Sequence, residues 1–128
     1  MKIDAPAAIA TRSRLSQPIG APEGSDTPLE YDRVTLGVAA PGELRILLIE
    51  DSDRIRQRLT AMLTVPGQMR AVAAAATESE SRAQIEAGQY DALLVDVELK
   101  QGSGIGAIRH ARHFYPVARQ PLIIVLTN

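Results

Sequence analysis

Short apolar runs, each followed at once by an acidic or hydroxyl side chain, are the feature that most constrains how this chain can fold. Parallel strands that are buried on both faces of a sheet read as continuous apolar runs of this kind. In open α/β sheets, ligands bind beyond the carboxyl ends of such strands. We therefore expect four polar side chains to meet at one edge of one sheet. They are Glu50 and Asp51 after the run 44–49, Asp96 after the run 92–95, and Thr127 after the run 122–126.

Amphipathic segments alternate with the apolar runs, a pattern that is typical of βαβ units and a parallel sheet. Strands are predicted at 44–49, near 69–75, at 91–96 and at 121–127, and helices at about 53–64, from 77 to 88 and from the 102–104 turn to 116. Ser52 is a natural N-cap, and Thr77 with Glu80 forms a capping box. The inner stripes are expected at Ile55, Leu59, Met62 and Leu63 in the first helix, and at Ile105, Ile108 and Ala111 or Arg112 in the third.

Composition and charge narrow the classes of function. The chain has 128 residues and a formal net charge of −1. It therefore lacks the excess of positive charge that is typical of proteins that bind nucleic acid or a membrane surface. It contains no cysteine, which excludes disulfides and a thiol nucleophile. Asp4, Pro6 and Arg12 interrupt the N-terminus, so it does not read as a signal peptide, and no run approaches membrane-spanning length. We expect one modest cytoplasmic domain.

The first 43 residues differ in composition from the rest. They are rich in Pro, Gly, Ala and Ser, and such a segment buries too little apolar surface to offset its ordering entropy. We expect residues 1–43 to form a mostly disordered leader. The alternation within Val34–Val38 leaves a half-buried strand there as an alternative.

From Leu44 to Asn128 the chain resembles the receiver domain of bacterial two-component response regulators. The acidic pair in Ile49-Glu50-Asp51-Ser52, the loop from Asp96 to Gly104 and the strand-terminal Thr127 carry the resemblance. It implies a flavodoxin-like (CheY-like) α/β fold, a doubly wound parallel sheet with strand order 2-1-3-4. The family's fifth strand and last two helices have no counterpart here, so residues 44–128 are expected to form an incomplete receiver-like domain.

That strand order places Asp51 and Asp96 at the ends of neighbouring strands. Two carboxylates about 4 Å apart repel by roughly 4 kcal/mol at an effective dielectric near 20, so the site must raise a pKa or bind a cation. Mg²⁺ suits it, because this hard ion is held in proteins by one or two carboxylates, several waters and a phosphate. A carboxylate oxygen could then attack a phosphohistidine or a small acyl phosphate.

The resemblance also implies roles, position by position. Asp96 matches the phosphoacceptor, Asp51 the direct Mg²⁺ ligand, and Glu50 the neighbour that acts through water. Glu98 stands where the family supplies a metal-binding main-chain carbonyl and a variable side chain, and Thr127 matches the hydroxyl that hydrogen-bonds the phosphoryl group. We thus expect a phosphoacceptor module that is no enzyme, although it catalyses its own phosphorylation and dephosphorylation. The implied partner is a sensor histidine kinase or a phosphotransfer protein.

The chain departs from the family in two respects. Its only lysines are Lys2 and Lys100, and neither matches the fifth-strand lysine that pairs with phosphoryl oxygens. Without the fifth strand, Leu122–Leu126 becomes an open sheet edge that can pair with another chain. We therefore expect either a homo-oligomer through this strand or a truncated product. One sheet face, covered by the first helix alone, is predicted to expose part of an apolar set: Leu47, Ile49, Leu93 and Val95.

Other readings stay open. The alternative function is a receiver remnant that acts without phosphorylation, competing for a kinase or pairing with another receiver. A phosphohydrolase of the haloacid-dehalogenase class would need a second aspartate where Glu98 stands. His110 and His113 lie one helical turn apart, but without an acidic partner they are interpreted as surface residues. The charges at Glu78, Glu80, Arg82 and Glu86 are interpreted as a solvated helix face.

Overall fold

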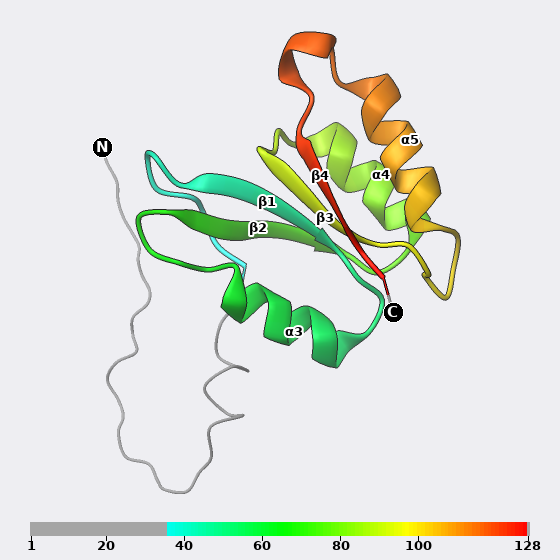
Figure 1. Cartoon of the computed structure of the whole chain (residues 1–128), viewed down its shortest axis with the longest axis horizontal. Helices are drawn as coiled ribbons and strands as arrows, with labels where there is room; N and C mark the ends of the chain where they lie inside the picture. Colours follow the sequence, from blue (N-terminus) through cyan, green and yellow to red (C-terminus); the bar gives the residue numbers. More distant parts are fainter. Residues whose placement is uncertain (1–35, 128) are drawn as a thin grey trace, which may run out of the picture.

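The computed structural model describes residues 36–127, which form a four-stranded sheet with helices on both faces (Figure 1). The elements, in chain order, are β1 (Leu44–Ile49), α3 (Asp53–Met62), β2 (Met69–Ala75), α4 (Glu78–Ala87), β3 (Ala92–Asp96), α5 (Gly104–Phe114), the short 3-10 helix η2 (Val117–Arg119) and β4 (Leu122–Leu126). Every predicted strand and helix is present, and their ends differ from the predicted ones by a few residues.

The sheet is parallel and its strand order is β2-β1-β3-β4. This confirms the predicted order, in which β1 and β3 are neighbours and the chain crosses from one to the other through β2 and α4. Helices α4 and α5 cover one face of the sheet and α3 covers the other (Figure 1). Residues 36–127 thus have the parallel α/β architecture that the resemblance to a receiver domain implies.

The two faces of β1 and β3 are both buried, and one prediction about them is wrong. The side chains predicted to be partly exposed lie under α4 and α5 and are fully buried; they are Leu47, Ile49, Leu93 and Val95. Alternate residues of a strand point to opposite faces, and the prediction assigned these four to the wrong face. The side chains under α3 are Ile46, Leu48, Ala92 and Leu94, and they are buried as well.

Within the sheet, most of the exposed large apolar side chains belong to β4. This strand is an outer strand of the sheet, and Leu122, Ile124 and Val125 are 63%, 44% and 44% exposed. Ile123 and Leu126 are partly buried, each against one of the two cores. The predicted open edge at Leu122–Leu126 is therefore present among the described residues.

The helix caps follow the sequence, whereas the inner stripes are narrower than predicted. The hydroxyl of Ser52 accepts the N–H of Ile55, and the hydroxyl of Thr77 accepts the N–H of Glu80. Of the four residues predicted for the inner stripe of α3, Leu59 and the C-cap residue Leu63 pack on the sheet, whereas Ile55 and Met62 are exposed. The inner stripe of α5 is Gly104, Ala107 and Ala111, with Ile108 beside it. Small side chains let this helix approach β3 and α4 closely, and Ile105 is left outside.

Residues 36–43, the part of the expected leader that the structure describes, pack on the domain. Glu43 is only 8% exposed, and its carboxylate accepts the N–H groups of Ala40 and Gly67, each at 2.8 Å. Residues 36–38 form no strand, although the N–H of Gly37 donates a 3.3 Å hydrogen bond to the carbonyl of Ala71 in β2. Residues 1–35, which hold the rest of the predicted leader and the start of the alternative strand, lie outside the described residues.

Among residues 36–127, no helix has both the length and the apolar character that crossing a membrane requires.

Candidate metal and phosphoacceptor site

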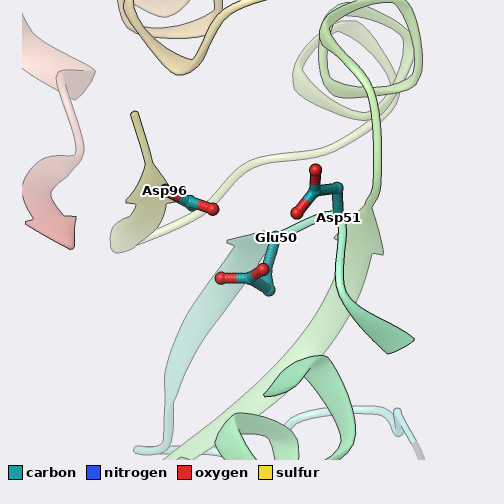
Figure 2. Close-up of side chains that lie close together, drawn as sticks. All are labelled: Glu50, Asp51 and Asp96. Carbon is teal, nitrogen blue, oxygen red and sulfur yellow. The ribbon is translucent and has the colours of Figure 1, made fainter. Parts of the chain in front are cut away.

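Three carboxylates meet at the carboxyl ends of β1 and β3 (Figure 2). Ile49 and Val95 are paired in the parallel ladder, so Glu50 and Asp96 follow at the same level and Asp51 lies one residue further. Each of the three residues offers a carboxylate oxygen, and these atoms all lie within 4.8 Å of one another. The sequence prediction that these side chains converge is in agreement with this geometry.

Glu50 is the most buried member of the cluster, only 4% exposed. Burial raises the pKa of its carboxyl group, and the neighbouring charges of Asp96 and Asp51 raise it further. The N–H of Ser52 opposes this shift by donating a 3.0 Å hydrogen bond to Oε2 of Glu50. Burial and like charge therefore act together to raise the pKa of Glu50.

Asp51 and Asp96 are half-buried, and main-chain N–H groups of the loop after β3 bind both of them. The N–H of Glu98 donates a 3.1 Å hydrogen bond to Oδ1 of Asp96. The N–H of Lys100 donates a 2.7 Å hydrogen bond to Oδ2 of Asp51. One loop thus orients carboxylates from two strands, an arrangement that the sequence reading did not predict.

Gly104 lets this loop pass close to the end of β3. A Cβ atom built there would lie 2.1 Å from the carbonyl oxygen of Asp96, which is main chain and cannot turn aside. The N–H of Gly104 also donates a 3.0 Å hydrogen bond to the carbonyl of Val97, closing the loop on itself. The position of Asp96 therefore depends on a residue without a side chain eight positions further on.

The cluster offers the set of ligand atoms that a hard cation site requires. Three carboxylate oxygens within 4.8 Å are donors of the kind that Mg²⁺ prefers, and their mutual repulsion falls when a cation neutralises them. Asp96 ends β3, which lies between β1 and β4. Asp96 is only half-buried, so it is accessible to solvent.

The other predicted site residues are less closely tied to the cluster. Thr127 follows Leu126, the residue that pairs with Asp96 in the β3–β4 ladder, and its side chain is exposed. It therefore lies at the carboxyl end of the sheet, as the three carboxylates do. Its hydrogen bond to a phosphoryl group stays a prediction. Glu98 is exposed and adds no carboxylate to the cluster. Its predicted role as a main-chain carbonyl ligand likewise stays a prediction.

Two interpretations of charged side chains need correction. His110 is not a lone surface residue, because its Nε2 lies 2.8 Å from Oε2 of Glu86 and its side chain is only 18% exposed. Glu78 is not simply solvated, because its Oε1 accepts the N–H of Ser103 at 2.8 Å. Helical periodicity alone could not show either contact, since each one joins α4 to α5 or to the turn before α5.

Relatives of known function match this chain over a limited span. A protein-glutamate methylesterase/protein-glutamine glutaminase of the group 2 operon of Cereibacter sphaeroides is 29% identical over 94 residues, which are 73% of this chain and 25% of the relative. A second methylesterase/glutaminase of the same species is 29% identical over 87 residues, 68% of this chain and 23% of its own length. The chain thus spans about a quarter of the length of these curated relatives.

Solved structures show the same fold. A LuxR-family two-component response regulator of Aurantimonas sp. SI85-9A1 superposes with a TM-score of 0.57 at 28% identity, covering 67% of this chain and 61% of the other. The receiver domain of a sensor histidine kinase of Pseudomonas aeruginosa PAO1, described with a magnesium ion coordinated in its active-site cleft, gives a TM-score of 0.56 at 31% identity. That superposition covers 66% of this chain and 67% of the other.

The sequence of residues 46–128 matches the family described as the response regulator receiver domain. This span holds the three clustered carboxylates, all four strands apart from the first two residues of β1, and all three α-helices. The chain therefore belongs to the response regulator receiver domain family.

Proposed function

We propose that Asp96 is the residue of this receiver that accepts the phosphoryl group. The observation that carries the proposal is the position of Asp96 beside Glu50 and Asp51, with ligand atoms within 4.8 Å. An oxygen of the Asp96 carboxylate attacks the phosphorus of a phosphohistidine. A P–O bond to Asp96 forms, the P–N bond breaks, and the released imidazole takes up a proton. With acetyl phosphate the bond that breaks is the P–O bond to acetate.

Mg²⁺ is the proposed cofactor. Asp51 and Asp96 would hold the ion with carboxylate oxygens, the main-chain carbonyl of Glu98 would add a ligand, and Glu50 would act through water. When bound, Mg²⁺ neutralises charge on the equatorial oxygens of the transferring phosphoryl group. The proposal is supported by the three clustered carboxylates and by the Mg²⁺ in the similar receiver domain from Pseudomonas aeruginosa.

The protein groups have separate parts in the transfer. The N–H of Glu98, now on Oδ1 of Asp96, leaves the other oxygen of that carboxylate available for attack. The hydroxyl of Thr127, at the end of β4, would donate to a phosphoryl oxygen. Because these groups act on a small acyl phosphate without a partner, the chain itself would promote its phosphorylation and dephosphorylation.

The proposed partner is a sensor histidine kinase or a phosphotransfer protein, in the cytoplasm, where such donors present a phosphohistidine. A second copy of this chain is a further proposed partner, through β4. The strand Leu122–Leu126 has no charged side chain, so two copies can approach without like-charge repulsion, and an unpaired strand edge is a template for another strand.

Phosphoryl labelling tests the acceptor. After incubation with Mg²⁺ and acetyl phosphate, intact-mass spectrometry should show one added phosphoryl group on the full chain. The label should be lost in Asp96→Asn and kept in Asp53→Asn, which changes an aspartate whose side chain is 86% exposed. Unchanged labelling of Asp96→Asn would mean that the acceptor is another residue.

The second candidate function is an interaction protein that is not phosphorylated. The feature that favours it is the exposed apolar surface of β4 within residues 36–127, where Leu122, Ile124 and Val125 are exposed, because an apolar patch of this kind marks an interaction site. The same experiment separates the two functions. A wild-type chain that takes no label, yet binds a histidine kinase, would favour the interaction protein.

A further inference from the structure

The loop between β3 and α5 is anchored by α4, a helix that gives no carboxylate to the cluster of Glu50, Asp51 and Asp96. The N–H of Ser103 donates a 2.8 Å hydrogen bond to Oε1 of Glu78. The N–H of Glu78 in turn donates a 3.1 Å hydrogen bond to the carbonyl of Gln101. The first residue of α4 therefore holds the loop through both its side chain and its main chain.

Two glycines leave the space that the Glu78 side chain fills. A Cβ at Gly106 would lie 2.2 Å from Oε2 of Glu78, and one at Gly102 would lie 2.4 Å from its Cβ. Gly102 also has φ of +82°, a conformation that glycine adopts without strain. Oε2 of Glu78 is bound by Arg82 at 3.1 Å. The carboxylate is thus fixed on both oxygens in a space that side chains at positions 102 and 106 would close.

The anchored loop contacts the acidic cluster through the residue just before Gln101. Lys100, whose N–H donates to Oδ2 of Asp51 at 2.7 Å, is adjacent to Gln101, whose carbonyl binds Glu78. In Figure 2 one oxygen of Asp51 points toward Glu50 and the other points away. With Oδ2 held by the loop, the carboxylate cannot rotate freely, and one oxygen stays available to the cluster.

We propose that Glu78 is a positioning residue for the acidic site: it anchors the loop so that the N–H of Lys100 holds the Asp51 carboxylate in the orientation that binds Mg²⁺. The effect on metal binding rests on the proposed function. The contact between the loop and Asp51 does not, and it can be measured without metal. Groups that orient metal ligands typically change metal affinity by about 10- to 100-fold.

Replacing Glu78 in the full chain tests this role. In Glu78→Ala the Lys100 amide hydrogen should exchange about tenfold faster relative to the Val95 amide, which reports opening of β3. The affinity for Mg²⁺ alone, titrated by NMR, should fall by about tenfold. Glu78→Gln keeps an oxygen that can accept from Ser103 and should restore most of both. Arg82→Ala, which removes the ion pair but leaves the Ser103 bond, should change either by less than about twofold.

A second perturbation reaches Glu78 without replacing it. In Gly106→Ala the new methyl group must displace the Glu78 carboxylate, because all three of its nearest contacts belong to that group. The Lys100 amide should then exchange faster and Mg²⁺ should bind more weakly, as in Glu78→Ala. In the Glu78→Ala background the added Gly106→Ala change should have no further effect on either quantity.

The outcomes separate this inference from the proposed function. A Glu78→Ala chain that unfolds more easily, yet keeps the wild-type exchange ratio of Lys100 and the wild-type Mg²⁺ affinity, would reduce Glu78 to a structural contact and overturn the inference. A wild-type chain that binds no Mg²⁺ and takes no phosphoryl label would overturn the proposed function. In that case the exchange ratio of Lys100 in the two variants still decides whether Glu78 anchors the loop.

Discussion

The carboxylate of Glu43 accepts a 2.8 Å hydrogen bond from the N–H of Gly67, which ties the residue before β1 to the turn before β2. The same carboxylate accepts the N–H of Ala40 and lies 3.2 Å from Nε of Arg70. Burial raises the pKa of Glu43, but these three donors outweigh it and hold the pKa below its ordinary value of 4.5. A buried, charged group therefore joins the two first strands.

Glu43 should make the stability of the domain sensitive to acid. A carboxyl group whose pKa is lower in the folded state contributes stability that is complete above about pH 4.5 and is lost as the pH falls through the folded pKa. Glu43→Gln should lower the free energy of unfolding by about 2 kcal/mol at pH 7, in the range for hydrogen bonds to charged groups, and by less at pH 3. Urea unfolding at both pH values measures this, with the exposed Glu98→Gln as a control. Equal losses at both pH values would contradict the prediction.

Mg²⁺ should bind at the carboxyl ends of β1 and β3. In an NMR titration the amide shifts should change around residues 50–53 and 96–99, because the ligand carboxylates lie there. Asp51→Ala should abolish these changes, and His113→Ala should leave them as they are. Shift changes centred on His110 and Glu86, which lie 2.8 Å apart, would place the ion elsewhere.

Gly104→Ala should destabilise the domain and weaken the site together. A methyl group 2.1 Å from the carbonyl oxygen of Asp96 must push β3 and α5 apart, and overpacking of this kind costs about 2 kcal/mol. Urea unfolding and Mg²⁺ titration of the same sample measure the two effects. Ile105→Ala, at an exposed neighbour in the same helix, should change stability by less than about 1 kcal/mol. Wild-type stability of Gly104→Ala would show that the loop can yield.

A polypeptide of residues 1–128 should associate through β4. Burying about 400 Å² of apolar surface contributes on the order of 10 kcal/mol at 25 cal/mol/Å², and the ordering of side chains offsets much of this. Sedimentation should show a concentration-dependent dimer, and Ile124→Lys should shift it to monomer by placing a charge on the exposed strand. Val117→Lys, which changes a residue outside β4 that is already 92% exposed, should still dimerise. A monomeric wild type at high concentration would refute the prediction.

The fold could be predicted because its signals are local. The apolar runs predicted the strands, and Ser52 and Thr77 predicted where two helices begin. The side chains after β1 and β3 predicted the acidic cluster. The face to which each strand residue points was predicted wrongly for Leu47 and its three companions. In a strand that is buried on both sides, both faces are apolar, and the sequence pattern carries no sign of which helix covers which face.

The contacts around the site escaped prediction for a different reason. The donor on Asp51 is the main-chain N–H of Lys100, and any residue except proline offers such a donor. Glu78 has the charge pattern of a solvated helix, and only the loop that returns to it from β3 reveals its partner. A signal for Glu78 did exist in Gly102 and Gly106, but Gly102 was interpreted only as part of a turn and Gly106 was given no role. The role of Glu43 was not predicted because the expected domain begins at Leu44, which assigned Glu43 to the leader.

The two edges of the sheet differ in a way that limits how large an assembly can grow. The segment before β1 occupies the start of the β2 edge, because the N–H of Gly37 donates a 3.3 Å hydrogen bond to the carbonyl of Ala71. Within residues 36–127, β4 is the outer strand that has no such contact from the rest of the chain, so it is the free edge. Fibres that grow by strand addition need two free edges on every subunit. A subunit with one such edge can pair with only one partner through strand addition. Association through β4 therefore ends at a closed pair.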